Sequence, residues 1–350
     1  MYKYSFIIPT YNSEKYVLLC VQSILDMHRE DIEIVIIDDG SKDNTRNICK
    51  CICENNANVR LICKDNGGVS STRNLGILSA EGEYVIFVDS DDMVESEKMN
   101  FLLDKISIDS NIDMAIYGMS FNYYYKNNCY RKDEILPPMD KRISNSNLCE
   151  CIYDLFSHNC ISPCWNKVIK KELLTCNNIG FREDMFFYED FEFSINCMKV
   201  SENILLVQDC IYQYRQVEDE GNAGRRLLKI SDLSKLSEQI EIPLMRLVEG
   251  CGKKEVLLQA KDIILDLYLT WAKEKIAVCD SNEIRIIQRD FRKWWDKHKY
   301  EVSKSRNEKI VKLLNGTPIS FKMHNIYIYF RHGLAIRLKN LGIVQRKNGR

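Results

Sequence analysis

Residues 84–92 read Tyr84-Val85-Ile86-Phe87-Val88-Asp89-Ser90-Asp91-Asp92, an apolar run that ends in three carboxylates. The run is short, rich in β-branched and aromatic residues, and uncharged, which predicts a buried strand. Acids at the carboxyl end of such a strand lie where open α/β sheets bind ligands. Two interpretations are open at this point. The acids form a site for Mg²⁺ or Mn²⁺, because clustered carboxylates need a cation, or they cap the N-terminus of a helix.

Strands and helices alternate on both sides of this stretch. Upstream, apolar periodicity predicts strands at 3–8, 32–37 and 59–62, with helices at 14–27, at 43–54 and around Arg73. Downstream, it predicts a strand at 113–119, a hairpin or loop at 121–145 and a helix at 146–160. This alternation is typical of an α/β, doubly wound, mostly parallel sheet with helices on both faces. Tyr11, Asp39 and Asp91 each follow a predicted strand, so we expect them to share one edge of the sheet.

The character of the chain changes near residues 216–225. From there, long helical periodicities dominate, at 227–249, 254–278 and 282–299. We therefore predict an N-terminal domain at 1–215 and a mainly helical C-terminal region at 216–350. No acidic residue follows Glu308, and residues 317–350 alternate Lys and Arg with aromatic and aliphatic side chains. This tail has two interpretations: peripheral contact with an anionic membrane, or packing on its own domain or a partner.

Composition limits the classes of function. The formal net charge of −1 over 350 residues gives no electrostatic case for a nucleic-acid partner. The start of the chain lacks a signal-peptide pattern, and no apolar run reaches transmembrane length, so we expect a cytoplasmic protein with reduced thiols. Of the 15 cysteines, Cys49, Cys51 and Cys53 alternate on a predicted helix without a second pair at zinc spacing. No glycine-rich dinucleotide fingerprint or P-loop is present, so a nucleotide must be held by side chains and a metal.

Short motifs follow one another along the chain: Ile8-Pro9-Thr10-Tyr11-Asn12, Asp38-Asp39-Gly40-Ser41, Asn66-Gly67-Gly68, Arg73-Asn74-x-Gly76, Asp89-Ser90-Asp91-Asp92, Trp165-Asn166-Lys167 and Glu189-Asp190. Each is weak alone, but the ordered set resembles the family 2 glycosyltransferases of the GT-A fold, over about residues 3–215. The resemblance is to bacterial sugar transferases of capsule and exopolysaccharide synthesis. It implies an inverting transfer of a hexosyl or N-acetylhexosaminyl group from a nucleotide-diphosphate sugar, typically a UDP-sugar, to a hydroxyl acceptor.

The resemblance also implies roles for the residues at the strand ends. Residues that would contact the donor are Pro9, Thr10, Tyr11, Asp39, Asn66, Arg73, Asp89 and Ser90. Within this set, Asp39 would bind the base, typically uracil through N3–H, and Arg73 would approach the base or the diphosphate. Asp91 would ligate Mn²⁺ or Mg²⁺. Asp89 would reach the ribose or a metal-bound water, and Asp92 keeps the helix-cap interpretation.

Downstream, the resemblance implies that Asp190 is the general base, with Glu189 the weaker candidate. Inverting displacement needs a carboxylate on the acceptor side to take the hydroxyl proton. The aromatic residues flanking this pair predict partly apolar surroundings, which raise a carboxylate pKa. The alternative for the pair is solvated acids at a helix N-terminus. Tyr188 departs from the family pattern, because a small residue, often glycine, stands there in many relatives.

Trp165, Asn166 and Lys167 are weaker candidates for contact with the donor sugar or the acceptor. For Trp165 the choice is between stacking on a sugar and packing in the core. For Lys167 the choice is between binding the diphosphate of the donor and forming a salt bridge within the protein.

We therefore expect a metal-dependent glycosyltransferase that acts on a glycan or a lipid-linked saccharide, at the inner face of the plasma membrane if the tail binds there. The alternative is a non-catalytic GT-A-fold subunit or scaffold of a polysaccharide-assembly complex. The acids retained at positions 39, 89, 91 and 190 argue against that alternative. A nucleotidyltransferase is disfavoured, because that class has a glycine-rich loop where this chain has Pro9-Thr10-Tyr11-Asn12.

Overall fold

The computed structural model describes residues 2–125, 128–185, 188–217, 240–248, 253–276, 281–298 and 304–315. These residues form two compact units. The first holds everything described up to residue 217 together with 240–248 and 253–260, and the second holds the described residues from 261 onward. The division into 1–215 and 216–350 stays a prediction, because most of the boundary segment lies outside the described residues. The basic tail at 317–350 also lies outside them.

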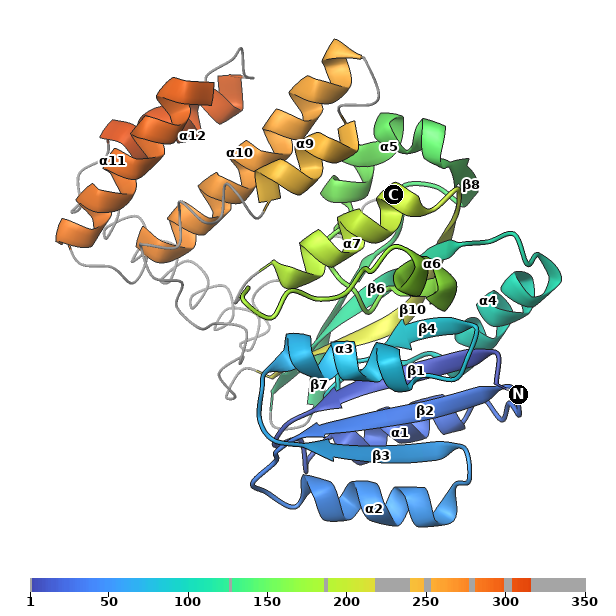
Figure 1. Cartoon of the computed structure of the whole chain (residues 1–350). Helices are drawn as coiled ribbons and strands as arrows, with labels where there is room; N and C mark the ends of the chain where they lie inside the picture. Colours follow the sequence, from blue (N-terminus) through green and yellow to red (C-terminus); the bar gives the residue numbers. More distant parts are fainter. Residues whose placement is uncertain are drawn as a thin grey trace, which may run out of the picture. The chain divides into compact units, whose positions relative to one another are not determined.

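The first unit contains a sheet whose strands lie in the order β3 (Val59–Lys64), β2 (Ile32–Asp39), β1 (Tyr4–Thr10), β4 (Tyr84–Phe87), β9 (Lys167–Lys170), β6 (Met114–Tyr125), β10 (Asn203–Val217) and β5 (Met93–Val94) (Figure 1). At its side, β7 (Asn128–Ile135) pairs with β6, and β8 (Lys141–Ser144) pairs with β10. Strands β1 to β4 are mutually parallel, as are β6 and β10, whereas β9 runs antiparallel to β4 and β6. The predicted mostly parallel sheet is confirmed.

The strand order reverses at β1, and this reversal positions the site. From β1 the chain passes to β2 and then β3 on one side, and it returns to β4 on the other. Every residue of β1 and β2 is buried, as expected for strands covered on both faces. In such sheets, ligands bind outside the carboxyl ends of the strands where the order reverses. The loops after β1 and β4 therefore occupy the expected binding edge.

Helices connect the strands of the first unit. They are α1 (Val17–Leu25), α2 (Thr45–Asn55), α3 (Val69–Ser79), α4 (Ser96–Ile108), α5 (Asn145–Ser157), α6 (Lys171–Cys176), α7 (Glu189–Val200) and α9 (Ile242–Val248). Helix α3 packs on β1 and β2. Its Gly76 lies so close to the sheet that a Cβ would stand 2.3 Å from Ile7 Cγ2, which explains glycine in the motif that begins at Arg73. The predicted helix that carries Cys49, Cys51 and Cys53 is confirmed as α2.

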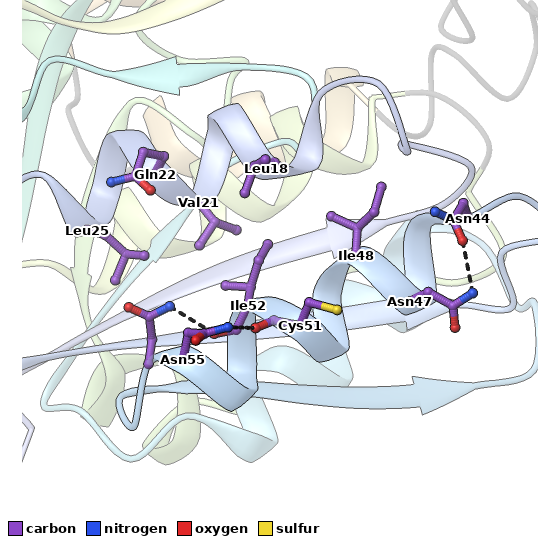
Figure 2. Close-up of a pocket in the computed structure, with 11 residues that line it drawn as sticks. Leu18, Val21, Gln22, Leu25, Asn44, Asn47, Ile48, Cys51, Ile52 and Asn55 are labelled. Atoms are coloured by element: carbon purple, nitrogen blue, oxygen red, sulfur yellow. Dashed lines mark hydrogen bonds between the residues drawn. The ribbon is translucent and has the colours of Figure 1, made fainter.

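Helices α1 and α2 lie side by side with an open groove of about 380 Å³ between them (Figure 2). Leu18, Val21 and Leu25 of α1 face Ile48 and Ile52 of α2 across it. Amide side chains border the groove and bond locally, Asn47 to Asn44 and Asn55 to the carbonyl of Cys51. None of the motif residues lines this groove, so it is separate from the edge where the acids lie.

The second unit is helical. Helix α10 (Lys254–Ile276) begins in the first unit and continues into the second, where α11 (Ser281–His298) and α12 (Lys304–Asn315) follow. The Tyr268 and Phe291 rings lie 6.3 Å apart, and Gln288 donates to the carbonyl of Leu313. The helices predicted at 254–278 and 282–299 are confirmed, whereas α12 was not predicted. Of the helix predicted at 227–249, only α9 falls in the described residues.

Two further findings concern the residues that the structure describes. In the described part of the chain, no helix combines the length and apolarity needed to cross a membrane. The cysteines described there form no disulfide.

Candidate active site at the strand ends

Hydrogen bonds join the loops that follow β1, β2 and β4. The hydroxyl groups of Ser13 and Ser90 lie 2.7 Å apart, which links the loop after β1 to the acidic loop after β4. Asn12 N donates to Ser41 Oγ at 3.0 Å, and Ser13 N donates to Thr45 Oγ1 at 2.7 Å. The structure thus brings together the three loops that the topology places on one edge, and Ser90 serves to connect them.

The loop after β1 offers one aromatic ring to solvent. Pro9 and Thr10 belong to β1 and are buried, and the Thr10 hydroxyl donates to the carbonyl of Ile8 at 3.2 Å. Tyr11 is 45% exposed and stands directly beyond the strand. Of the residues expected to line a nucleoside pocket here, Tyr11 therefore has the accessible side chain, while Pro9 and Thr10 contribute buried backbone support.

Asp39, at the end of β2, is buried and binds the loop after β3. Its Oδ1 accepts from Lys64 Nζ at 2.5 Å and from Gly67 N at 2.8 Å. Its Oδ2 accepts from Gly68 N at 2.9 Å. The exposed Asn66 donates from its side chain to the Asp39 carbonyl at 2.9 Å. Asp39 therefore fixes the Asn66-Gly67-Gly68 loop beside its own carboxylate, and Lys64 joins it as a residue that the motifs did not single out.

The acids after β4 have three different environments. Asp91 is exposed, and Asp89 is part-exposed and accepts from Arg73 Nη2 at 3.1 Å. Asp92 is 1% exposed; its carboxylate accepts from the Tyr212 hydroxyl at 2.6 Å and from Arg215 N at 2.7 Å. Burial raises the pKa of Asp92 well above its usual value, and the Asp91 and Asp89 carboxylates add to the effect.

The helix-cap interpretation of Asp92 is wrong. The residue is followed by β5, and α4 begins only at Ser96, with Glu95 at its N-cap. Asp92 instead ties the acidic loop to the end of β10. Sequence could not show this, because both hydrogen-bond partners lie more than a hundred residues downstream.

Arg73, on α3, connects the acids after β4 with those of α7. Its guanidinium lies 2.5 Å from Asp190 Oδ1, 3.1 Å from Asp89 Oδ1 and 3.5 Å from Glu189 Oε1. The side chain is 5% exposed, and its guanidinium carbon lies 5.2 Å from the centre of the Phe181 ring. The resemblance implied contact with the base or the diphosphate; the structure shows Arg73 inside a carboxylate cluster, where it holds the two groups of acids together.

Glu189 and Asp190 begin α7. Tyr188, the N-cap residue, has a φ of 60°, a left-handed conformation that glycine adopts most easily. This explains why relatives often carry a small residue there: the backbone geometry suits glycine. Phe191 and Phe193 are buried behind the pair, as their apolar character predicted, whereas Phe186 and Phe187 lie outside the described residues. The pair therefore lies at a helix N-terminus and is followed by buried aromatic side chains of the same helix.

Asp190 is electrostatically perturbed. Burial raises the pKa of Asp190 to about 7; Arg73 opposes the shift, and the Glu189 and Asp89 carboxylates add to it. About a quarter of the side chain is still exposed. A carboxylate that is reachable from solvent and has a pKa near neutrality is suited to accept a proton from a hydroxyl.

Trp165, Asn166 and Lys167 are buried. Trp165 is 7% exposed, and its ring stacks on Tyr212 with centroids 4.1 Å apart, so the core interpretation is the one that fits. Asn166 donates to the carbonyl of Tyr117. Lys167 is fully buried and donates to Asn166 Oδ1 at 2.7 Å and to the carbonyls of Cys160, Ile161 and Pro163.

Both interpretations given for Lys167 need correction. In the described part of the chain it forms no salt bridge, and its ammonium group is taken up by backbone carbonyls rather than facing the strand ends. Burial lowers the pKa of Lys167 to about 8. The residue therefore fixes the loop that precedes β9, which is a supporting role.

The residues fit a divalent cation that is shared with a substrate. Among the described residues, no cluster of three or more His, Cys, Asp or Glu side chains could hold a metal by itself. Asp92 is buried and bonded to Tyr212 and Arg215, so the accessible carboxylates of this loop are those of the exposed Asp91 and the part-exposed Asp89. Mg²⁺ and Mn²⁺ are commonly bound through one or two carboxylates together with substrate phosphates, so this donor set fits such a metal.

Comparisons with known proteins agree with this geometry. A sequence model described as "Glycosyl transferase family 2" matches residues 5–168. The chain is 29% identical over 214 residues to the uncharacterized glycosyltransferase EpsJ of Bacillus subtilis, a match that covers 61% of this chain and 60% of EpsJ. It is 30% identical over 224 residues to glycosyltransferase GlyG of Streptococcus pneumoniae, which covers 61% of this chain and 70% of GlyG. The chain thus spans less than two thirds of the first of these relatives.

The fold also occurs in a solved structure. The crystal structure of Staphylococcus aureus TarS 1–349 matches with a TM-score of 0.58 and 19% identity, and the match covers 92% of both chains. A second structure of the same fragment, in complex with UDP-GlcNAc, matches with a TM-score of 0.57. At this identity the likeness establishes a common fold.

Proposed function

This chain belongs to glycosyl transferase family 2, and we propose that it moves a sugar from a UDP-sugar, with inversion, to a hydroxyl of a glycan or lipid-linked acceptor in surface polysaccharide synthesis. The observation that carries the proposal is the cluster around Arg73. A single guanidinium holds Asp89, on the donor side, and Asp190, the candidate base, within 3.1 Å and 2.5 Å. The complex of TarS with UDP-GlcNAc supports a nucleotide-sugar donor for this fold.

The chemistry follows from the positions of the acids. Asp91, assisted by Asp89, would hold Mg²⁺ or Mn²⁺, and such a cation supplies neutralisation of the diphosphate that leaves. Asp190 takes the proton of the acceptor hydroxyl as that oxygen attacks the anomeric carbon. Arg73 keeps Asp190 oriented and shields its charge from Asp89. Glu189, 3.5 Å from Arg73, would orient the acceptor rather than accept its proton.

The Asp39 carboxylate supports uracil as the base. A carboxylate accepts about four hydrogen bonds, and in the described part of the chain Lys64, Gly67 and Gly68 supply three of them. One hydrogen-bond acceptor position, on Oδ2 of Asp39, remains for a ligand. Uracil presents a single N3–H donor between two carbonyls, whereas guanine presents two adjacent donors.

We expect UDP to compete with the donor about ten-fold or more better than GDP, because a second guanine N–H would remain unpaired against Asp39. Inhibition constants for UDP and GDP, measured in the same transfer assay, check this. Asp39→Asn should reduce the preference, since it replaces an acceptor by a donor, and Asp140→Asn, at an exposed position far along the chain, should not. Equal inhibition by UDP and GDP would contradict the uracil assignment.

The raised pKa of Asp190 predicts the pH dependence. The base works only when ionised, so kcat/KM should fall as the pH drops through about 7, well above the ordinary range of an aspartate. Glu189→Gln removes a neighbouring negative charge and should move the midpoint to lower pH. Glu192→Gln, on the same helix beside Arg182, is the matched control. A wild-type midpoint near 4 would argue against Asp190 as the base.

The location and the acceptor are also proposals. We infer a cytoplasmic site of action, where the free cysteines of the described residues would stay reduced, and a peripheral membrane contact through residues 317–350 from their sequence alone. A donor screen tests the whole assignment: release of UDP from several UDP-sugars is measured by mass spectrometry with Mn²⁺, with Mg²⁺ and with chelator. Absence of donor binding and turnover throughout the panel would favour a non-catalytic subunit.

A further inference from the structure

Arg215 stands at the end of β10, next to the acidic loop. Its backbone N donates to Asp92 Oδ1 at 2.7 Å, so the strand end and the loop are joined directly. Its side-chain Nε donates to the backbone carbonyl of Asp91 at 3.1 Å. The guanidinium is thereby held within contact of the residue proposed to bind the metal. Arg215 ends the Tyr212-Gln213-Tyr214-Arg215 segment of β10, and the sequence alone assigned it no role.

Two tyrosine rings restrain the same guanidinium. Its central carbon lies 4.3 Å from the centre of the Tyr124 ring and 4.9 Å from that of Tyr16. Tyr124 belongs to β6, and Tyr16 ends the loop between β1 and α1. Cation–π contacts and the Nε hydrogen bond fix the position of the group without using its two terminal nitrogens. In the described part of the chain, no carboxylate forms a salt bridge with these nitrogens.

Three other cations near these strand ends are already bonded to groups of the protein. Arg73 is buried among three carboxylates, Lys64 is bonded to Asp39, and Lys167 is bonded to backbone carbonyls. Arg215 differs, because its position is fixed while its terminal N–H groups point to no described acid. A planar fork of N–H donors matches the oxygens of a phosphate in geometry and charge.

We propose that Arg215 binds the diphosphate of the nucleotide sugar through its terminal nitrogens, beside the cation held by Asp91, and stabilises the charge on the departing nucleoside diphosphate. The inference rests on the proposed function and extends it to a residue outside the motifs. The contact forms with the ground-state donor and strengthens as the bond from the anomeric carbon to the β-phosphate oxygen breaks, when the electron pair passes to that oxygen.

The test compares UDP with UMP, which lacks the second phosphate. Binding of each to the full chain is measured by calorimetry with Mn²⁺ and again with chelator, for wild type, Arg215→Met and Arg215→Lys. We expect Arg215→Met to lose about ten-fold to a hundred-fold in affinity for UDP, with and without metal, and to keep its affinity for UMP within about two-fold. Arg215→Lys should recover part of the loss. Arg131→Met is the matched control, because Arg131 also lies over a tyrosine ring, Tyr123, on the same hairpin.

The outcomes separate this inference from the proposed function. Equal loss of UDP and UMP affinity in Arg215→Met would overturn the inference, because that pattern reports a structural role at the loop. A loss of UDP affinity that appears only with Mn²⁺ would also overturn the inference, because the substitution would then act through the metal held by Asp91. If Arg215→Met fails to fold, a lowered ratio of UDP to UMP affinity in Arg215→Lys supports the inference and an unchanged ratio refutes it. Wild-type protein that binds no UDP at all would instead remove the proposed function.

Discussion

We expect Asp190→Asn to lower kcat for sugar transfer by a factor on the order of 10³ while leaving UDP-sugar affinity nearly unchanged. The amide keeps the size of the side chain and can still bond within the cluster around Arg73, but it cannot take a proton from the acceptor. The loss should therefore appear in kcat rather than in donor binding. Single-turnover transfer and calorimetric donor titration of the same preparations measure the two effects separately.

Controls exist on the same helix. Glu192→Gln changes a carboxylate two residues away that pairs with Arg182, and it should retain activity. Glu189→Gln should fall between the two, because Glu189 contacts Arg73 without being the proposed base. Turnover of Asp190→Asn close to that of wild type would show that another group accepts the proton.

The second large effect is expected at Asp91. Asp91→Asn should lower turnover by a factor on the order of 10² to 10³, because it removes the exposed carboxylate that would hold the cation against the diphosphate. The stimulation by Mn²⁺ should disappear with it. Initial rates across a Mn²⁺ titration, for wild type and variant, measure both quantities.

Chelation gives an independent measurement. Removal of metal should bring wild-type protein down to the rate of Asp91→Asn, and it should change the variant little. Asp140→Asn is the control for loss of one exposed carboxylate elsewhere. A wild-type rate that chelator does not change, or full activity of Asp91→Asn, would show that no cation acts at this loop.

The sheet was predictable because its signals are local. Uninterrupted apolar runs such as Tyr84–Phe87 give buried strands, and acids or turn residues end them. The order of the motifs then placed Asp39 and the loop from Asp89 on one edge, since the ends of parallel strands meet there. In the structure, the loops at that edge are hydrogen-bonded to one another through Ser13 and Ser90.

The predictions that were wrong concern side chains whose partners are distant in sequence. Asp92 was assigned to a helix cap, but the Tyr212 hydroxyl and Arg215 N determine its position. The backbone carbonyls around Lys167 come from a turn that no residue type announces. No role was predicted for Arg215 for the same reason, because only the fold places Tyr16 and Tyr124 beside it. The sequence identified the chemical groups here, whereas tertiary contacts determine which of them are buried in hydrogen bonds and which stay exposed at the strand ends.

Arg73 makes the two halves of the site thermodynamically dependent on each other. Its guanidinium bonds to Asp89 and Asp190 at once, so a ligand that changes how Asp89 is held must also change the free energy of holding Asp190. Such linkage is reciprocal: donor and acceptor alter each other's affinity by the same factor, whichever binds first. We therefore expect the strength of this coupling to depend on the ion pairs of Arg73. Arg73→Lys keeps the positive charge but loses the two-sided guanidinium, so in this variant the two affinities should become more nearly independent.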